Sequence, residues 1–588
     1  MDPMQAYKVR FANDIFIDGD WVYFTEKYIR NDEYHSIIKR MDRSGNIVQV
    51  TFGENERYPK IYGNSLFYIK YTKEKESLMR VDNLSEAKEI ASFAKISDYV
   101  LIGKDIYVIA QEPTDNTLPF EAHDIKYRFN ARGLLRSYNA LYRIREKPEK
   151  IYSGNFDVTG IRSNGGRIVI STTENSNDYG LTDLFEIDAE GKKLKRITKD
   201  SADINDFAIS DSGRIAFSGY YGLDVGRVSN IVFPEEDLEI SVGKDAYNSV
   251  IGDSFGGSHY RILFYGNKIY AIGQDRSSSF VYEVGDEVRR ITPEERNIVD
   301  FDFRGSLAYI YSDMVHPSVV SFDSEYDLNP DIRGIKAQSF DMDGGECFAM
   351  VASKDAPSIL FIHGGPHTAY GHTYFIEFQY FFSNGYNILF CNPPGSTGYG
   401  QEYEKACIGD WGGKDLQYIE KFVKECRIKY GLTGKIGVTG GSYGGYMTNW
   451  IVTQTNEFAC AISERSISNL FSMIGTSDIG FWFNTLELDL KDPYSSEGMQ
   501  KLMEFSPINY VKKVKTPTML ITGEEDYRCP IEQAEQFYVA LKLNNVDASL
   551  VRYPGDNHEH ARSGVPKNML DRLKRKTEWF DRYLKKEN

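Results

Sequence analysis

The sequence predicts two unlike parts: a seven-bladed β-propeller over residues 1–330 and a doubly wound α/β domain over residues 331–588. The 588 residues exceed the length of one domain, which usually reaches at most about 250 residues. Short strands that follow a glycine recur through the first part, whereas strands and helices alternate in the second. All six cysteines lie after residue 346, which agrees with a chain made of two different parts.

The repeated segment of the first part is a strand that begins just after a glycine. It occurs seven times, at Gly19, Gly63, Gly103, Gly166, Gly213, Gly266 and Gly305. Further strand-like runs and turn formers separate the copies, so a repeat of about 40–50 residues has room for the four strands of a propeller blade. A tandem of β-sandwiches is the alternative, because the intervals are irregular. The longest interval, from Gly103 to Gly166, contains a polar stretch that we interpret as an insertion.

The pattern of the second part begins at about Ser358, where apolar strands alternate with longer amphipathic segments. The expected strands are 358–362, 387–391, 435–439, 459–463, 518–522 and 549–553. Segments 416–429 and 531–543 have the apolar spacing of helices, so we expect a mostly parallel sheet. Residues 1–12 form a short extension before the first blade that can pack on this second domain.

The composition excludes several classes of protein. With 69 Lys and Arg against 85 Asp and Glu, the net charge is −16, which argues against a nucleic-acid partner. No run of about 18 apolar residues is present, and the first residues lack the apolar core of a signal peptide. No two cysteines have the C-x-x-C spacing of a zinc or redox site. We therefore expect a cytoplasmic protein with reduced thiols and no membrane contact.

The motif G-x-S-x-G occurs twice, around Ser254 and around Ser442. Ser442 follows the β-branched strand 435–439 and precedes the helix-like segment 446–452. This strand, tight turn and helix form the nucleophile elbow of an α/β-hydrolase, in which strained backbone exposes the serine hydroxyl. Ser254 lies among the blade strands, where a glycine-rich turn is the simpler interpretation. We therefore predict an α/β-hydrolase domain with Ser442 as its nucleophile.

The acid and the base of such a site follow the serine in the chain, each on a loop after a strand. The loop after strand 518–522 contains three acids, Glu524, Glu525 and Asp526. The loop after strand 549–553 contains two histidines, His558 and His560. We predict Asp526 and His558 as the functional pair. His560 is the competing base, and a solvated loop residue is its other interpretation.

The predicted mechanism uses a covalent intermediate. Neutral His558 takes the proton of Ser442, ionised Asp526 stabilises the imidazolium, and Ser442 forms an acyl-enzyme. The transition state also needs hydrogen-bond donors for its oxyanion. The backbone N–H groups of Tyr443, next to the nucleophile, and of Gly365, in a glycine-rich loop after an early strand, are the expected donors.

Three histidines lie close together around that glycine-rich loop: His363, His367 and His372. They suggest a metal site, but no H-E-x-x-H pattern is present, and Gly-Gly-Pro between the first two breaks any helix that could align them. We interpret His363 as a support for the loop and predict no metal and no cofactor.

Taken together, the motifs resemble those of the acylaminoacyl peptidases of the prolyl oligopeptidase family. The resemblance covers almost the whole chain and is strongest in residues 363–366, 392–400, 409–413, 440–445, 526–530 and 557–559. It implies a seven-bladed propeller before an α/β-hydrolase domain, with Ser442, Asp526 and His558 as the triad and Gly365 and Tyr443 as oxyanion donors. One departure is Pro394, where relatives usually carry Arg in N-x-R-G-S.

The resemblance also implies residues that bind substrate. Arg528 would lie near the substrate, with a surface ion pair to Glu524 or Glu525 as the alternative. The aromatic stretch 476–483, with Phe481 and Trp482, would form a hydrophobic pocket, with core packing as the alternative.

The implied activity is that of a serine exopeptidase that releases N-acylated amino acids from short peptides. The dipeptidyl peptidases of the family hold a free amino end with a Glu pair, whereas Glu235 and Glu236 lie in a polar run that is simpler to interpret as a loop. The alternatives are a dipeptidyl peptidase or general oligopeptidase, a carboxylesterase with the same triad, and a non-catalytic peptide-binding propeller. The resemblance further implies short peptides as partners, admitted through the propeller, and association into a homo-oligomer.

Overall fold

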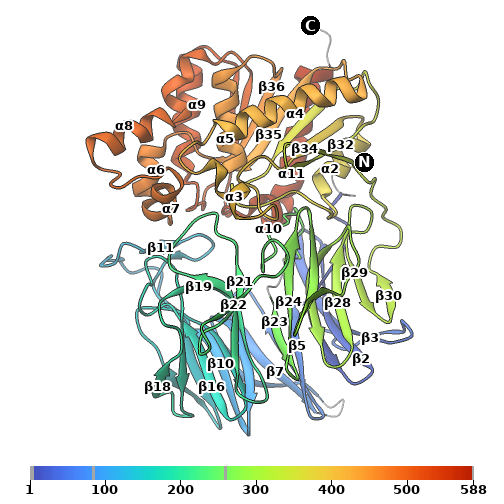
Figure 1. The fold of residues 1–588 in the computed structure, drawn as a ribbon, viewed down its shortest axis with the longest axis vertical. Helices are drawn as coiled ribbons and strands as arrows, with labels where there is room; N and C mark the ends of the chain where they lie inside the picture. Colours follow the sequence, from blue (N-terminus) through green and yellow to red (C-terminus); the bar gives the residue numbers. More distant parts are fainter. Residues whose placement is uncertain (1–5, 83–85, 257–260, 586–588) are drawn as a thin grey trace.

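The computed structural model describes residues 6–82, 86–256 and 261–585, and every structural statement below refers to these residues. Seven four-stranded sheets form the lower, blue-to-green part of the molecule, and one eight-stranded sheet with helices forms the upper part (Figure 1). The predicted propeller followed by an α/β-hydrolase domain is confirmed, and the alternative of tandem β-sandwiches is wrong.

Each blade is an antiparallel sheet whose four strands follow one another along the chain. The first two blades contain β1 (Phe11–Asp18), β2 (Trp21–Arg30), β3 (Glu33–Asp42), β4 (Ile47–Gln49), β5 (Glu56–Tyr62), β6 (Ser65–Tyr71), β7 (Glu76–Asp82) and β8 (Lys88–Phe93). The third and fourth contain β9 (Lys95–Ile102), β10 (Asp105–Gln111), β13 (Ala140–Ile144), β14 (Pro148–Tyr152), β15 (Val158–Asn164), β16 (Arg167–Thr172), β17 (Asp183–Ile187) and β18 (Lys193–Arg196). The last three contain β19 (Ala202–Ile209), β20 (Ile215–Tyr221), β21 (Asn230–Phe233), β22 (Leu238–Ile240), β23 (Ile262–Tyr265), β24 (Lys268–Asp275), β25 (Ser278–Val284), β26 (Val288–Arg290), β27 (Asn297–Phe303), β28 (Leu307–Ser312), β29 (Val319–Phe322) and β30 (Ser324–Asp327).

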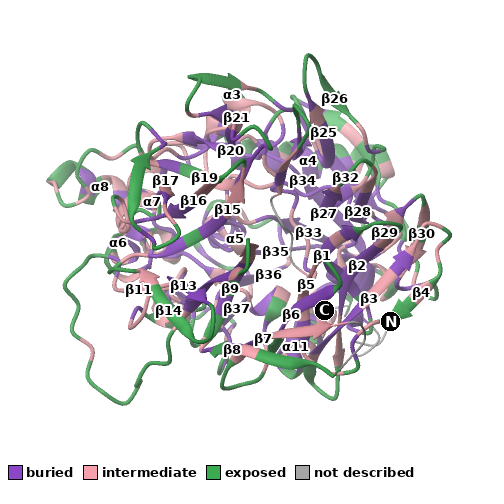
Figure 2. Ribbon diagram, turned by 90° about the horizontal axis from the view of Figure 1, so that it is seen from below, coloured by how far each residue is buried: buried purple, intermediate pink, exposed green. Residues whose placement is uncertain are grey.

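The seven glycines of the repeat all occupy the same place, the turn between the first and second strands of a blade. Each has a positive φ, from 58° at Gly19 to 88° at Gly305, which a residue with a Cβ adopts only with strain. The second strands are mostly buried, whereas outer strands such as β18 and β26 are exposed, as the purple and green ribbons of Figure 2 show. The periodic glycine therefore marks the blades.

The ring of blades closes through side chains. The backbone N–H groups of Ile15 and Ile17 on β1 donate to the carboxylates of Asp300 and Asp302 on β27, at 2.9 and 2.8 Å. These bonds satisfy amide groups on the edge of the first blade, which would otherwise lack partners. The first and last blades are thus joined without sharing a strand.

An insertion of the third blade, residues 112–139, carries the hairpin of β11 (Arg128–Phe129) and β12 (Gly133–Leu134). It lies between two strands of one intact blade, as the sequence predicted. The hairpin contacts the upper domain, because the backbone N–H of Asn130 donates to the carboxylate of Asp478 at 2.8 Å. The insertion therefore reaches from the propeller to the domain that holds the predicted nucleophile.

The upper sheet has the order β31-β32-β34-β33-β35-β36-β37-β38. Its strands are β31 (Gln338–Met342), β32 (Gly345–Met350), β33 (Ser358–Ile362), β34 (Asn387–Cys391), β35 (Ile436–Ser442), β36 (Cys460–Ser466), β37 (Thr518–Gly523) and β38 (Ala548–Tyr553). The six expected strands are present and mutually parallel. The sequence reading missed β31 and β32, an antiparallel edge hairpin.

Helices cover both faces of this sheet. They are α2 (Ile376–Ser383), α3 (Gln401–Glu404), α4 (Lys414–Tyr430), α5 (Tyr443–Gln454), α6 (Leu470–Thr476), α7 (Gly480–Glu487), α8 (Ser496–Glu504), α9 (Ile531–Leu543), α10 (His560–Ser563) and α11 (Pro566–Phe580), with short 3₁₀ turns at Lys405–Cys407 and Pro507–Lys513 and a π turn at Asp581–Lys585. Both predicted helices, 416–429 and 531–543, correspond to α4 and α9. In the part of the chain that the structure describes, no helix is both long and apolar enough to cross a bilayer.

The N-terminal segment before β1 packs on the upper domain. Ala6, Tyr7 and Val9 are buried in one apolar cluster with residues of the upper sheet and of α11, among them Phe348 and Trp579. The segment therefore ties the two domains together from the start of the chain. The domain limit expected at residue 330 falls between the end of β30 and the start of β31, and no observation here tests its exact place.

Candidate active site

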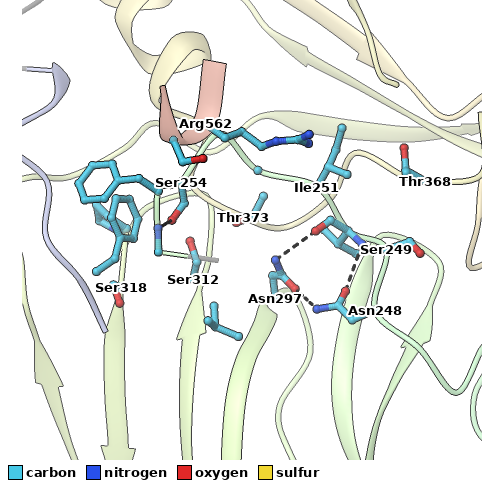
Figure 3. Close-up of a pocket in the computed structure, with 18 of the residues that line it drawn as sticks. Asn248, Ser249, Ile251, Ser254, Asn297, Ser312, Ser318, Thr368, Thr373 and Arg562 are labelled. Carbon is cyan, nitrogen blue, oxygen red and sulfur yellow. Dashed lines mark hydrogen bonds between the residues drawn. The ribbon is translucent and has the colours of Figure 1, made fainter. Parts of the chain in front are cut away.

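The two G-x-S-x-G matches have different surroundings. Ser254 lies in the loop between β22 and β23, beside a cavity between the domains (Figure 3), and its hydroxyl accepts a hydrogen bond from the N–H of Gly256. The preceding Asp253 accepts bonds of 2.7 Å from Ile376 and Glu377, the first two residues of α2. This loop therefore holds the propeller against the upper domain.

Ser442 lies at the sharp turn between β35 and α5. Its φ of 61° and ψ of −123° are unusual for a residue with a side chain, and such strained backbone is typical of a nucleophile elbow. The turn allows no bulk nearby, because a Cβ at Gly444 would lie 2.1 Å from the carbonyl oxygen of Ile362 on β33. The glycines of the motif thus permit close packing, and the strain presents the serine above the sheet.

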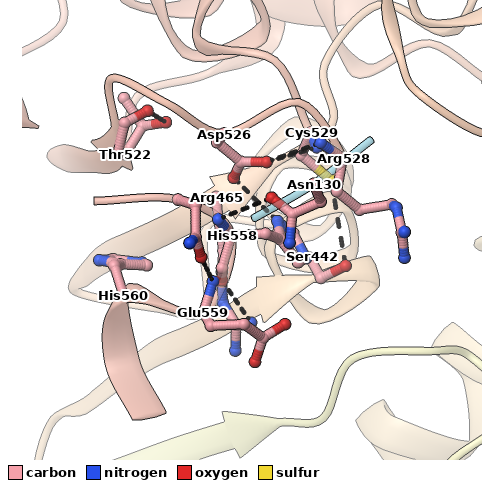
Figure 4. A network of polar contacts seen from close by, with 12 residues as sticks. Asn130, Ser442, Arg465, Thr522, Asp526, Arg528, Cys529, His558, Glu559 and His560 are labelled. Carbon is pink, nitrogen blue, oxygen red and sulfur yellow. Dashed lines mark hydrogen bonds and ion pairs between the residues drawn. The ribbon is translucent and has the colours of Figure 1, made fainter. Parts of the chain in front are cut away.

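Asp526 and His558, the predicted acid and base, lie side by side. The Nδ1 atom of His558 lies 2.8 Å from Oδ2 of Asp526, and both side chains are buried (Figure 4). The other carboxylate oxygen accepts bonds from the N–H groups of Arg528 and Cys529, at 2.9 and 2.8 Å. Burial lowers the pKa of His558 below its usual 6.5, against the opposing effect of Asp526. The imidazole is therefore neutral at pH 7 and can accept a proton.

One cavity of about 240 Å³ brings the nucleophile, the base and the expected oxyanion donors together. Ser442, His558, Gly365 and Tyr443 all line it, and the serine Oγ lies 3.9 Å from Sγ of Cys529. The five predicted catalytic residues thus meet at one place, since Asp526 lies directly behind His558. Their chemical roles stay predictions.

The alternative acids and base do not take these places. His560 is buried, 1% exposed, with Nε2 3.9 Å from Glu464, so its interpretation as a solvated loop residue is wrong. Burial lowers the pKa of His560 well below the usual value. Glu524 and Glu525 are exposed, and Glu524 forms an ion pair with Arg552.

The expected oxyanion donors flank Ser442. Tyr443 is the first residue of α5, where a backbone N–H has no partner within the helix. Its side chain is buried, and its hydroxyl donates to Asp415. Gly365 has a φ of +115°, and a Cβ there would lie 2.5 Å from the backbone nitrogen of His367, so glycine is required. Two backbone N–H groups can thus face the oxygen of a bound carbonyl.

Arg528 forms an ion pair, but its partner is neither Glu524 nor Glu525, the two partners considered from the sequence. Its Nε and Nη2 atoms donate to the two oxygens of buried Asp478, at 2.7 and 3.1 Å. The alternative of a surface pair with Glu524 or Glu525 is therefore wrong. Against the effect of burial, Asp478 raises the pKa of Arg528, so its charge is retained beside the cavity.

The apolar wall of the cavity comes from neighbouring residues of the predicted aromatic stretch. Ile479 and Phe483, one helical turn apart at α7, line the cavity together with Met473. Trp482 lines an adjoining cavity of about 500 Å³, and Phe481 packs against Tyr179 with ring centroids 6.0 Å apart. Phe483, the last residue of the predicted stretch, is thus its one aromatic residue that lines the cavity with Ser442, whereas Phe481 and Trp482, the two residues singled out, do not line it; the pocket role of the stretch stays a prediction.

Asn130 is a site residue that sequence reasoning missed. Its side-chain oxygen accepts a hydrogen bond of 3.2 Å from the backbone N–H of His558, and Figure 4 shows it beside the His558 loop. The neighbouring Phe129 ring lies 5.4 Å from the guanidinium of Arg528. The only sequence feature that pointed to Asn130 was the polar insertion itself. That feature did not indicate which part of the structure the insertion contacts.

The three histidines near the glycine-rich loop contact three different partners. His363 Nε2 lies 2.9 Å from Oγ of Ser396, and His372 Nδ1 lies 3.0 Å from Oγ of Ser278. His367 Nε2 lies 3.0 Å from Glu487, with Cys407 close by, and the ligand atoms of these three residues lie within 4.8 Å of one another. Although burial opposes it, Glu487 raises the pKa of His367 to about 8, so the two groups can form an ion pair without a metal. The contact does not have the geometry of a hydrogen bond.

The fold defines the class of protein: an α/β-hydrolase domain preceded by a seven-bladed β-propeller. Residues 25–317 match the acylaminoacyl-peptidase N-terminal β-propeller domain, and residues 372–587 match the prolyl oligopeptidase family. The chain belongs to the prolyl oligopeptidase family of serine peptidases, which confirms the resemblance of its motifs.

Curated relatives match mainly one part of the chain. The uncharacterized peptidase YuxL of Bacillus subtilis (strain 168) is 48% identical over 230 residues, which cover 39% of this chain and 35% of the relative. The acylamino-acid-releasing enzyme of Rattus norvegicus is 30% identical over 210 residues, covering 34% of this chain and 28% of that enzyme. The matches therefore span about a third of these relatives' length.

Solved structures match the whole fold. The acylaminoacyl peptidase of Pyrococcus horikoshii superimposes with a TM-score of 0.87 at 23% identity, over 100% of this chain and 98% of that one. A structure of an acylaminoacyl peptidase in complex with Z-Gly-Gly-Phe-chloromethyl ketone has the same TM-score, 0.87, at 24% identity and the same coverage, 100% and 98%. Both domains, and their arrangement, are thus shared with these structures.

Proposed function

We propose that this protein is a serine exopeptidase that releases N-acylated amino acids from the blocked ends of short peptides. The observation that carries the proposal is the buried pair of Asp526 and His558, whose histidine lines one cavity with the strained Ser442. The apolar wall formed by Ile479 and Phe483 suits an uncharged, apolar side chain at the residue that is released.

The proposed reaction follows from the protonation states of these residues. Neutral His558 accepts the Ser442 proton as the hydroxyl oxygen attacks the carbonyl carbon, and Asp526 stabilises the resulting imidazolium. The N–H groups of Gly365 and Tyr443 bind the developing oxyanion. His558 then protonates the leaving amine, and water later releases the acyl group from the serine by the same steps in reverse order.

A blocked amino end is favoured over a free one because Glu235 and Glu236 are engaged elsewhere. Glu235 forms ion pairs with Arg167 and Lys195, at 2.7 and 2.6 Å, and Glu236 pairs with Arg214. Neither carboxylate is left to bind an ammonium group. The inhibitor in the related structure is also blocked at its amino end and carries Phe at its reactive end.

The setting of the reaction is part of the proposal. All six cysteines are free and buried, which suits a reducing compartment, and we propose a cytoplasmic location. We also propose that several copies associate, and light scattering coupled to gel filtration would measure their number.

A panel of chromogenic substrates tests the activity. Acetyl-Leu and acetyl-Phe p-nitroanilides are expected to be cleaved faster than the same residues with a free amino end, an X-Pro anilide or a p-nitrophenyl ester. Cleavage of X-Pro anilide without cleavage of the acetylated substrates would instead indicate a dipeptidyl or oligopeptidase. Ser442→Ala is expected to lower kcat by about 10⁴-fold or more, and full activity in this variant would disprove the nucleophile.

A further inference from the structure

A second cavity adjoins the one that holds Ser442. It has a volume of about 530 Å³ and lies between the propeller and the upper domain, within the range of about 300–1,000 Å³ common for ligand sites. Ile251, Thr368, Glu559 and Arg562 line both cavities, so the two spaces meet at these residues. A ligand bound at Ser442 can therefore extend into the second cavity.

The second cavity lies on the side of the catalytic cavity from which the leaving group departs. His558 must reach the leaving nitrogen to protonate it, so the leaving peptide lies on the His558 side. The His558 loop continues directly into α10, whose Arg562 lines both cavities. The apolar wall with Phe483 lines only the cavity that holds Ser442. We therefore assign this wall to the acyl part of the substrate.

Positive charge exceeds negative charge where the two cavities meet. Arg562 lies there and Arg465 lines the smaller cavity, and among the described lining residues of the larger cavity the only carboxylate is Glu559. Glu559 accepts a 2.6 Å bond from Nε of Arg562, which leaves the two terminal nitrogens of that guanidinium without a protein partner in the described chain. Figure 3 shows the Arg562 side chain extended over the cavity toward Ile251.

Arg465 and Lys27 add to the excess of positive charge around the two cavities. The Nη1 of Arg465 donates to the carbonyl of His558 at 3.0 Å, while its buried Nε has no hydrogen-bond partner within the described residues. Burial and the charge of Arg562 both lower the pKa of Arg465, which shows that the two cations repel each other. Lys27, on the propeller wall, contributes a third cation, which donates to the carbonyl of Phe255 at 2.8 Å. An anion bound here would relieve the repulsion.

We propose that Arg562 binds the C-terminal carboxylate of the leaving peptide, so that the preferred substrates are N-acylated peptides of a few residues with a free C-terminus. Such a peptide would place its acylated residue against Ile479 and Phe483 and its carboxylate near Arg562, where the second cavity begins; that cavity also presents neutral polar groups of Asn248, Ser249 and Thr373. A guanidinium with two free N–H groups suits a carboxylate, which it can bind with two parallel hydrogen bonds. This inference rests on the proposed exopeptidase activity and adds its substrate class.

The experiment compares acids with amides. Peptides with acetyl-Leu followed by one, two or three alanines are prepared with a free C-terminal carboxylate and with a C-terminal amide, and kcat/KM is measured for each. The wild-type enzyme is expected to prefer the acid about tenfold at its best length, and raising NaCl from about 0.05 to about 0.5 M should reduce that preference. Arg562→Gln is expected to bring the ratio near one, and Arg562→Lys to restore most of it.

The outcomes separate this inference from the proposed activity. An acid-to-amide ratio of kcat/KM near one for the wild-type enzyme at every peptide length would overturn the inference, and so would an unchanged ratio in Arg562→Gln. In either case, cleavage of acetyl-Leu p-nitroanilide would still support the exopeptidase activity. If the wild-type enzyme does not cleave that anilide, both proposals fail. Thermal unfolding of each variant checks its folding, and the acid-to-amide ratio of the wild-type enzyme needs no variant.

Discussion

The backbone N–H of His558 donates a hydrogen bond to the side-chain oxygen of Asn130, a residue 428 positions earlier in the chain. The backbone N–H of Asn130 donates in turn to Asp478, which holds Arg528. One residue of the propeller insertion therefore contacts both the loop of the predicted base and the ion pair beside the cavity. This contact makes the propeller part of what positions the loop of the predicted base.

Removal of the Asn130 side chain is expected to slow the reaction without unfolding the protein. Asn130→Ala leaves the buried N–H of His558 without a partner, which costs about 1–3 kcal/mol, so kcat should fall by about tenfold or more. Asn130→Asp keeps the acceptor and should restore most of kcat. Its added negative charge favours the imidazolium of His558, so the acid limb of its pH profile should move to higher pH. Steady-state kinetics from pH 5 to 9 measure both effects.

A matched control for this prediction lies in the same insertion. Thr117 is exposed and bonds only locally, to Asp115, so Thr117→Ala should leave kcat and the pH profile as they are. Equal losses of kcat in Thr117→Ala and Asn130→Ala would show that the insertion acts through its general folding. An unshifted pH profile in Asn130→Asp would contradict a contact with the base.

The pH dependence of kcat/KM should report the state of His558. Burial lowers its pKa below 6.5, and only the neutral imidazole accepts the serine proton. The rate should therefore stay on its plateau at pH 7 and fall as pH drops through a pKa below 6.5. Glu559→Gln removes a carboxylate that raises the pKa of His558, so it should move the acid limb to still lower pH. An acid limb of the pH profile above pH 7 would speak against His558 as the base.

Local patterns were enough to predict the fold and to select residues that meet in one candidate site. A positive φ at the same turn of every blade requires glycine, so the blades could be counted from the sequence. The elbow of Ser442 is likewise local, because strand, turn and helix follow one another within about twenty residues. The acid and base loops could be found because the order of Ser, Asp and His is shared by this architecture.

Contacts between distant segments could not be predicted in this way. Asn130 and Asp478 act through partners that lie in another domain or on another loop, and no periodicity connects them. The choice of Phe481 and Trp482 over Phe483 depended on which face of a short helix points to the cavity. Three consecutive aromatic residues do not determine that face. His560 is buried by the packing of α11 and Glu464 around it, a property of the tertiary structure alone.

The ion pair of Arg528 and Asp478 should contribute to both stability and substrate binding. Asp478→Asn leaves the partly buried guanidinium without its counter-ion, which is expected to cost about 1–3 kcal/mol of unfolding free energy. Because Arg528 lines the catalytic cavity, the same change should raise KM more than it lowers kcat. The double variant Asp478→Asn with Arg528→Met should be more stable than Asp478→Asn alone, yet no more active. Additive losses of stability in the double variant would show that the pair is not coupled.

The ion pair of His367 and Glu487 should make stability depend on pH. The pKa of His367 is raised from 6.5 to about 8 in the folded protein, so its contribution is fully present below about pH 6.5 and is lost as pH rises through 8. A shift of this size corresponds to about 2 kcal/mol. His367→Asn keeps a donor for the carbonyl of Gly395 and removes the titrating group. The difference in unfolding free energy between the wild-type protein and this variant, measured with urea, should therefore be larger at pH 6 than at pH 9 by about that amount.

A chelator separates the ion pair from a metal site at the same residues. Because His367, Glu487 and Cys407 place their ligand atoms within 4.8 Å of one another, a bound metal would also stabilise this region. The ion pair predicts that EDTA leaves the melting temperature of the wild-type protein unchanged at every pH. If EDTA lowered that temperature in the wild-type protein and had no effect on His367→Asn, the three residues would hold a metal, and the pH dependence would need a different explanation. If stability were the same at pH 6 and 9 in both proteins, the charge on His367 would have no structural role.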